Sequence, residues 1–96
     1  MSPLSRKKLN KLRGKLDKLD SNLLELIKKR SNLVNEVLKL KIYKKEIIDQ
    51  KRIKFILKKI NKKSIKSKID PKITNRIWKN MIWSFIDYEK RNFKKK

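Results

Sequence analysis

An arginine interrupts the most regular apolar pattern in the chain. Leucine recurs at alternating steps of three and four from position 9 to position 26, and the next step falls on Arg30. The stripe then resumes with Leu33, Val37 and Leu40. A guanidinium that faces the inside of a helix pair needs a partner, because burying a charge without one is very costly. The stripe carries no acid near Arg30, so we expect an anionic ligand there.

Two further cations lie on the same side of the predicted helix. Lys41 lies about 20° around the helix and roughly 16 Å along it from Arg30, so both side chains could reach one small anion. Arg13 lies about 25 Å from Arg30, too far for the same ligand within one helix. If two copies pair antiparallel around residue 24, Arg13 of the partner subunit falls between Arg30 and Lys41. The spacing therefore favours a symmetric homodimer with two shared sites, although Arg13 or Lys41 could instead be ordinary surface residues.

Arg52 and Glu89 are the other charged candidates. Arg52 lies beside Asp49 at the start of a second predicted helix and can point into the same cleft if that helix folds back on the first. Glu89 continues the apolar stripe that includes Phe85, so its carboxyl group should be paired or protonated. Each also has a plainer interpretation, because Glu89 could bind one of the many lysines and Arg52 could pair with Asp49.

The elements that must position these residues are all helical. The sequence shows no strand alternation, has no proline between Pro3 and Pro71, and contains one glycine, Gly14. The apolar spacing predicts a first helix over residues 5–42, which would be roughly 55 Å long. Such a helix is too long to pack within a domain of this size, so we expect it to reach into a partner chain.

Two shorter helices complete the predicted protomer. We expect a break at 43–48, after which Asp49 should cap the second helix. A Lys- and Ser-rich loop is predicted at 61–69, and Asp70 followed by Pro71 should start the third helix. We expect one apolar face of each shorter helix to form the core: Ile53, Ile56, Leu57 and Ile60 in the second, and Ile77, Trp78, Met81, Ile82, Phe85 and Ile86 in the third.

Charge and composition restrict the function classes. The chain has 31 Lys and Arg against 9 Asp and Glu, a net charge of +22, and it has no His or Cys. It therefore lacks the usual general base, thiolate chemistry and soft-metal ligands, so we expect neither a metal nor a cofactor. The charge could indicate nucleic-acid binding. However, basic residues occur along the whole length and 25 of the 31 are lysines, which favours a general compositional bias.

The length and the absence of long apolar segments define the expected organisation. We expect one helical domain over residues 1–96, with disordered tails at 1–6 and 94–96. No segment has the apolar length of a signal peptide or a membrane span. The sequence therefore predicts a cytoplasmic protein with no membrane partner.

Two segments of the chain resemble the all-helical chorismate mutase family. The run LRGKLDKLDSNLLELIKKRSNLVNEVLKLK, residues 12–41, is similar to that family's first helix, and IIDQKR, residues 47–52, is similar to the start of its second. The third helix fits in length and apolar pattern, so the resemblance covers 9–93. It implies an all-α, three-helix protomer with one very long N-terminal helix, in an intertwined homodimer. It also implies the rearrangement of chorismate, a dicarboxylate, to prephenate in aromatic amino-acid biosynthesis.

The resemblance implies roles for the cationic residues and for Glu89. Arg30 and Arg13 of the partner subunit would hold the two carboxylates of the substrate. Lys41 would contact a carboxylate and the ether oxygen, and Glu89 would donate a hydrogen bond to that oxygen. Such a rearrangement needs no nucleophile, proton transfer or metal, which agrees with the absence of His and Cys.

Four more positions would complete the pocket. By resemblance, Asp49 and Arg52 would line the entrance and the ring side. Ile53 stands where many members of the family place a Glu that binds the ring hydroxyl, and Phe85 stands near a usual Ser. The pocket would therefore be more apolar at its hydroxyl end than is usual in the family.

Three alternatives remain open from the sequence. A related branch of the fold, isochorismate-pyruvate lyase, tends to be apolar at the positions of Ile53 and Phe85. A basic helical nucleic-acid-binding dimer is the next alternative, and it is disfavoured because Arg30 on an inward stripe could not reach a phosphate backbone. A coiled-coil interaction module without catalytic activity leaves Arg30 and Glu89 unexplained.

Overall fold

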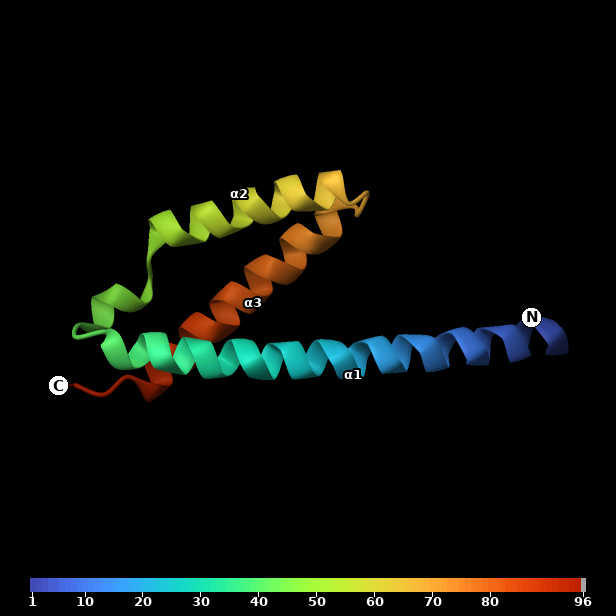
Figure 1. The fold of residues 1–96 in the computed structure, drawn as a ribbon, viewed down its shortest axis with the longest axis horizontal. Coiled ribbons are helices and arrows are strands. Elements are labelled where there is room, and N and C mark those ends of the chain that lie inside the picture. The colour runs from blue at the N-terminus through green and yellow to red at the C-terminus, as the bar shows by residue number, and fades with distance from the viewer. Residues whose placement is uncertain (96) are drawn as a thin grey trace. The chain divides into compact units, whose positions relative to one another are not determined.

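Residues 1–95 form three α-helices and one short 3-10 helix. The computed structural model describes residues 1–95, and it places no β-strand in that range. Figure 1 shows the elements in chain order: α1 (Pro3–Leu40), the 3-10 helix η1 (Lys44–Ile47), α2 (Gln50–Lys66) and α3 (Pro71–Asn92). The predicted all-α class and long first helix are confirmed, and the predicted break at 43–48 contains η1. Over residues 1–95, no helix is long and apolar enough to cross a membrane.

α1 is 38 residues long, which corresponds to about 57 Å. It begins at Pro3, directly after Ser2, whose hydroxyl oxygen accepts a hydrogen bond from the Ser5 backbone N–H at 3.1 Å. α1 therefore includes residues 3–6 of the predicted N-terminal tail. At the other end, residues 94–95 follow α3 without regular structure, and residue 96 of the predicted tail lies outside the described residues.

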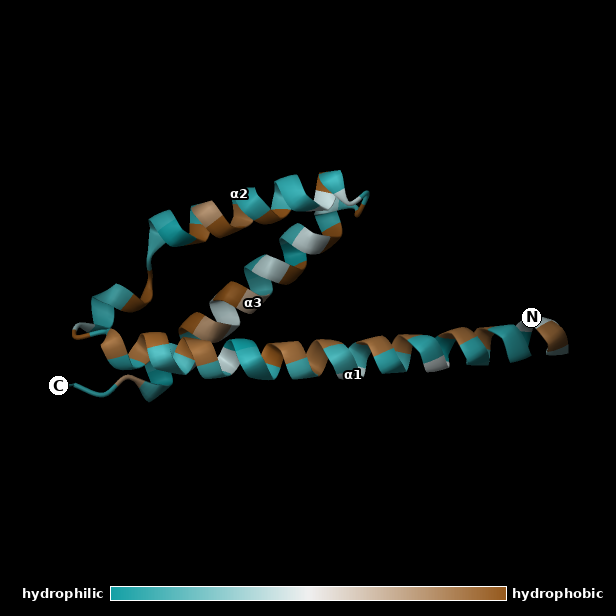
Figure 2. Ribbon diagram, in the orientation of Figure 1, coloured by the Kyte–Doolittle hydropathy of each residue, from teal (hydrophilic) through white to brown (hydrophobic). Residues whose placement is uncertain are grey.

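The chain divides into two compact units, Met1–Leu33 and Val34–Lys96. The first unit is one helical stretch, and Figure 2 shows hydrophobic residues recurring along α1. Five leucines of the predicted stripe are each 55–62% exposed: Leu12, Leu16, Leu19, Leu23 and Leu26. A single helical stretch cannot enclose its own apolar stripe, so this unit has no core of its own.

The second unit contains the hydrophobic core. Four buried side chains form its centre: Leu38 of α1, Ile47 of η1, and Ile82 and Ile86 of α3. Partly buried apolar residues of α2 pack against them: Ile53, Ile56 and Leu57. The predicted inward faces of the second and third helices therefore supply the core, and the last turns of α1 complete it.

One predicted core position of the third helix is wrong. Ile77 is 51% exposed, whereas Trp78 is half-buried and Ile82 is buried. The inward face follows steps of four residues from Trp78 to Ile82 and Ile86. Ile77 precedes this face by about 100° of helix rotation and therefore lies to its side.

Acidic side chains cap both helices of the α2–α3 hairpin, as predicted. Asp49 Oδ1 accepts a hydrogen bond from the Arg52 backbone N–H at 3.0 Å. Asp70 Oδ1 accepts one from the Lys72 backbone N–H at 2.9 Å, with proline in the first turn of α3. Each cap satisfies a backbone N–H group that has no partner within its helix.

The predicted loop at 61–69 is wrong for most of its length, because α2 continues to Lys66. Lysine is a good helix former, so a lysine-rich composition does not by itself end a helix. The buried hydroxyl of Ser64 forms a 2.6 Å hydrogen bond with the Thr74 hydroxyl of α3. This contact between the two helices holds the last turns of α2, and the turn is shortened to residues 67–70.

The backbone of that turn gives a stability prediction. Lys68 has a φ of 58°, in the left-handed region that costs a non-glycine residue about 1 kcal/mol. Its N–H donates to the Ile65 carbonyl at 3.1 Å, so the conformation belongs to the helix end. We expect Lys68→Gly to raise the free energy of unfolding by up to about 1 kcal/mol in urea denaturation. The control Lys62→Gly, inside α2, should lower it by about as much, and a loss of stability in Lys68→Gly would contradict the prediction.

Candidate active site

The clearest polar contact among the predicted site residues is an ion pair between Lys41 and Glu89. Lys41 Nζ donates to Glu89 Oε2 at 2.6 Å, and the two side chains are only 15% and 9% exposed. Lys41 directly follows α1, whereas Glu89 lies on α3. The sequence places both residues in one site, and the structure identifies Lys41 as the lysine that binds Glu89.

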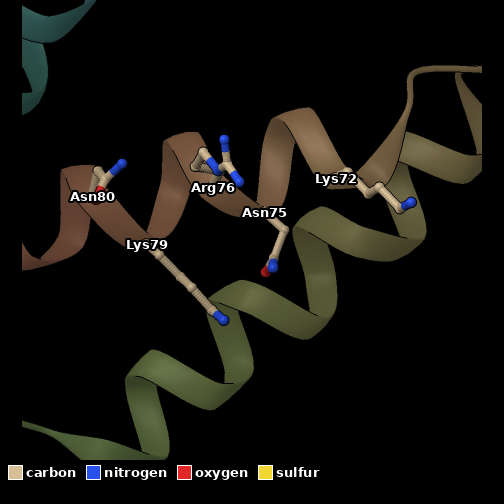
Figure 3. A pocket seen from close by; sticks show the side chains of 5 residues that line it. All are labelled: Lys72, Asn75, Arg76, Lys79 and Asn80. Atoms are coloured by element: carbon tan, nitrogen blue, oxygen red, sulfur yellow. The ribbon is translucent and has the colours of Figure 1, made fainter.

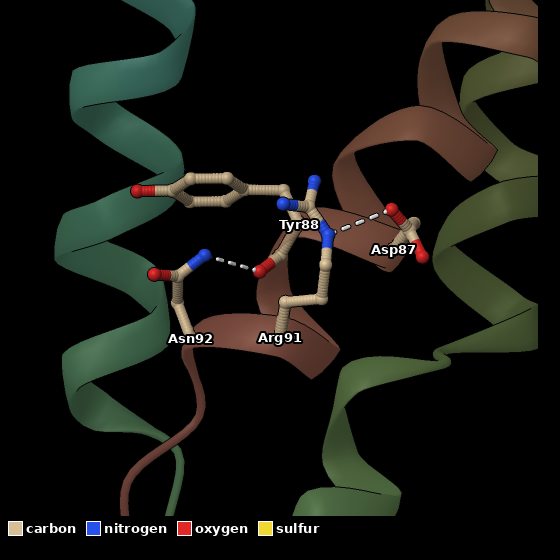
Figure 4. A network of polar contacts seen from close by, with 4 residues as sticks. All are labelled: Asp87, Tyr88, Arg91 and Asn92. Atoms are coloured by element: carbon tan, nitrogen blue, oxygen red, sulfur yellow. Dashed lines mark hydrogen bonds and ion pairs between the residues drawn. The ribbon is translucent and has the colours of Figure 1, made fainter.

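Burial makes this ion pair different from one at the surface. In the Arg91–Asp87 pair of α3 (Figure 4) the two side chains are 65% and 68% exposed. Exposed ion pairs of this kind contribute little to the stability of the fold. In the buried pair each charge depends on the other, because removal of one partner leaves an uncompensated charge. A lysine ammonium has three N–H donors and Glu89 accepts one of them. Lys41 can therefore bind an anionic ligand while it remains paired.

A hydrogen bond beside this pair fixes the end of α1 against α3. Tyr88 Oη donates to Asn35 Oδ1 at 2.8 Å, and Asn92 Nδ2 donates to the Tyr88 backbone carbonyl at 2.8 Å (Figure 4). Because Tyr88 adjoins Glu89, this contact helps to hold Glu89 opposite Lys41. Asn35 and Tyr88 are not among the site residues predicted from the sequence. The available signal was a tyrosine beside an inward-facing residue, since its hydroxyl usually finds a partner when it is buried.

A hollow of about 560 Å³ opens beside Lys41. It is lined by Lys41, Glu46, Ile48, Asp49, Gln50 and Lys51. Two predicted site residues, Lys41 and Asp49, therefore lie on one surface. The carboxylates of Glu46 and Asp49 already accept hydrogen bonds from backbone N–H groups, at 3.0 Å each. The ammonium groups of Lys41 and Lys51 are thus the groups of this hollow best suited to bind an anion.

Four other predicted site residues of the second unit do not line this hollow: Glu89, Arg52, Ile53 and Phe85. Arg52 is exposed, and its guanidinium carbon lies 5.3 Å from the centroid of the Phe55 ring. Ile53 is half-buried against the core, and Phe85 of α3 is also half-buried. No group of three or more acidic, His or Cys side chains that could hold a metal ion occurs in residues 1–95.

Arg13 and Arg30 belong to the first unit. Arg30 is half-buried, whereas its neighbours on the apolar stripe, Leu26 and Leu33, are 59% and 62% exposed. The arginine is therefore less exposed than the leucines on either side of it. Arg13 is exposed in the single chain.

The ion pair gives a prediction about stability and its pH dependence. We expect Lys41→Met to lower the free energy of unfolding by about 3 kcal/mol, because Glu89 is then buried without a counter-charge. Protonation relieves that charge, so the folded variant binds a proton that the unfolded chain has lost. The stability of the variant should consequently fall as pH rises above the range in which an unfolded-state Glu ionises.

Urea denaturation between pH 4 and pH 8 measures both effects, and Lys41→Met/Glu89→Leu is the matched control. The double variant should recover most of the lost stability and show a weaker pH dependence. Equal stability losses in the single and double variants would contradict the importance of the pair.

Comparison with known proteins identifies the family of the chain. A model of the chorismate mutase type II family matches residues 12–90. The match includes every predicted site residue from Arg13 to Glu89 and takes in all of α2. No curated protein and no solved structure matches the chain. From this match over most of its length, we conclude that the chain belongs to the chorismate mutase type II family, which implies isomerase activity.

Proposed function

We propose that this protein converts chorismate into prephenate, in aromatic amino-acid biosynthesis. The observation that carries the proposal is the family match over residues 12–90. The buried Lys41–Glu89 pair supports it, because Lys41 also lines a hollow large enough for a small anion. No cofactor is required for this reaction.

The proposed residues act by binding and by electrostatic stabilisation. In the rearrangement the ether C–O bond breaks as a new C–C bond forms, within one molecule. The protein must hold a compact conformer and stabilise negative charge that grows on the ether oxygen. Arg30 would hold a carboxylate through its planar fork of donors. Lys41, oriented by Glu89, would supply the positive charge at the ether oxygen.

We infer that each site is shared between two chains. The leucine stripe of residues 12–26 is exposed in one chain, and so are Ile73 and Ile77 of α3, at 55% and 51%. Covering these side chains with a second chain would remove apolar surface from water, which favours association. In an antiparallel pair, Arg13 of the partner subunit would complete the group formed by Arg30 and Lys41.

Arg30→Ala is the first test of activity. We expect it to lower kcat/KM for chorismate by at least about 100-fold, because it removes a preorganised charge from the transition state. Chorismate loss is followed by ultraviolet absorbance, and prephenate is identified by chromatography. The control Arg6→Ala, an exposed arginine in the first turns of α1, should keep full activity. Wild-type protein with no turnover above the uncatalysed rate would overturn the proposal.

Mixing two inactive variants tests whether the sites are shared. If Arg13 acts across the dimer, Arg13→Ala and Arg30→Ala chains form mixed dimers that have one intact site and one doubly impaired site. After refolding at equal amounts, random pairing should restore about a quarter of the wild-type activity. Mixed chains that stay as inactive as each variant alone would show that Arg13 does not act across the dimer.

The role of Glu89 is tested by its pH dependence. A carboxyl group donates a hydrogen bond to the ether oxygen only when it is protonated, whereas an amide donates at every pH. If Glu89 is that donor, we expect wild-type kcat to fall as pH rises and the kcat of Glu89→Gln to stay level. If wild-type kcat does not change with pH, Glu89 is not the hydrogen-bond donor, and its proposed role is reduced to orienting Lys41.

Isochorismate-pyruvate lyase activity is the second candidate. It is favoured by the apolar residues Ile53 and Phe85, which offer no polar group to a ring hydroxyl. Incubation with isochorismate, followed by assays for salicylate and pyruvate, compares it directly with the mutase reaction. A higher kcat/KM on isochorismate than on chorismate would make lyase the main activity.

A further inference from the structure

The positive charge of the chain is unevenly distributed between its helices. Residues 50–69, which include all of α2, contain nine Lys and Arg and no Asp or Glu. In α1, eleven Lys and Arg are accompanied by four acids over 38 residues. A compositional bias alone would mix acids into α2 as it does into α1. The excess of positive charge in residues 50–69 is therefore specific to that segment. The even distribution of charge expected from the composition is not found there.

Six lysines form one solvent-facing surface of α2, which we call the basic face: Lys54, Lys58, Lys59, Lys62, Lys63 and Lys66. All six are exposed, because the apolar residues of α2 pack into the core on its other side. No ion pair joins any of them to a carboxylate of residues 1–95. Like charges at this density repel one another. Binding of an anionic partner would reduce this electrostatic repulsion.

An exposed aromatic ring lies among these cations. Phe55 is 54% exposed, and its ring centroid lies 5.3 Å from the Arg52 guanidinium carbon and 5.8 Å from Lys59 Nζ. Aromatic rings beside a positively charged surface are the platforms on which bases of single-stranded nucleic acids stack. Cations that contact both the ring and a neighbouring phosphate reinforce such binding.

α3 contributes three more cations on the same hairpin. Lys72, Arg76 and Lys79 line a hollow of about 380 Å³ together with Asn75 and Asn80. Figure 3 shows the charged ends of the three cations pointing in different directions, with Lys79 directed toward α2 and Arg76 away from it, rather than gathered around one point. That arrangement is unsuited to a single compact anion. The three cations add to the positive charge that the hairpin presents to a polyanion.

We propose that the α2–α3 hairpin binds single-stranded nucleic acid without sequence preference. Phosphates contact the basic face and the cations of α3, and a base stacks on Phe55. An anionic membrane would be attracted by the same charge. However, Ile53, Ile56 and Leu57 of α2 pack against the core. The exposed apolar side chains of α2 are Phe55 and Ile65, at 54% and 61%, so the helix does not present a continuous apolar face to a bilayer. The six lysines of the basic face and Phe55 are not among the residues proposed to bind chorismate, so substitutions there test this proposal separately from chorismate turnover.

The first test is fluorescence anisotropy with a labelled oligothymidine of about 20 nucleotides, which is long enough to cover several sites. Wild-type protein should bind with an affinity that falls steeply as salt rises. We expect Lys58→Glu/Lys62→Glu/Lys66→Glu to weaken binding at least about tenfold and to reduce the logarithmic salt slope by about 2, since three phosphate contacts are lost. The corresponding Lys→Gln triple variant keeps the test valid if charge reversal disturbs folding.

A matched control carries the same change of charge on α1: Lys7→Glu/Lys18→Glu/Lys28→Glu. All three lysines are exposed. The loss of affinity in this control should be at most one third of the loss in the hairpin variant. Phe55→Ala should weaken binding about fivefold or more with little change in salt slope, because it removes stacking and no charge.

Three results would overturn the proposal. Equal losses in the two triple variants would show that only the overall charge attracts the strand. Unchanged affinity of Phe55→Ala would remove the base contact on which the choice of a single strand rests. Equal or tighter binding to vesicles that contain phosphatidylserine would assign the basic face to membranes instead.

Discussion

The apolar stripe of α1 is the constraint on which the rest of the structure depends. The core of the chain lies in residues 34–96 and uses one buried residue of α1, Leu38. The leucines from position 12 to position 26 take no part in it and stay more than half exposed. Their apolar surface is removed from water only when something else covers it. A second copy of the chain would meet that need, and this supports the proposal that Arg13 and Arg30 contribute to a site shared between two chains.

The charges of the proposed site follow from where the helices meet. Lys41 directly follows the end of α1, and packing of Leu38 against Ile82 and Ile86 brings that end to α3. Glu89 on α3 then pairs with Lys41 inside the protein. Under the proposed function, the pair would supply what a rearrangement without His, Cys or metal requires, namely a positive charge whose position is set before the substrate arrives.

The sequence predicted the parts of the fold that local chemistry decides. Asp49 and Asp70 were placed correctly as caps, because an acid before a helical pattern satisfies free N–H groups whatever the tertiary context. The loop at 61–69 was predicted wrongly because lysine and serine are common in loops, whereas the bond that keeps this segment helical comes from Thr74 on another helix. Ile77 failed for a similar reason, since which side of a wide apolar stripe is buried depends on the partner that packs there.

In the candidate site too, features set by local sequence could be predicted, whereas features set by the packing of helices could not. The interruption at Arg30 is visible in sequence because the leucine spacing around it is regular. The choice of Lys41 as the partner of Glu89 could not be read from a chain with 25 lysines. It depends on the packing of α1 against α3, as does the bond between Tyr88 and Asn35. The local charge of α2 was present in the sequence, but its exposure on one face became evident only when Ile53, Ile56 and Leu57 were placed in the core.

The oligomeric state in solution tests most directly whether the leucine stripes of two chains pair to form shared sites. Sedimentation of the purified protein at micromolar concentration should give a single species of twice the 11.7 kDa chain mass, with the leucine stripes covered. A stable 11.7 kDa species that still converts chorismate to prephenate would contradict it. In that case Arg13 and Arg30 could not belong to a site shared between two chains.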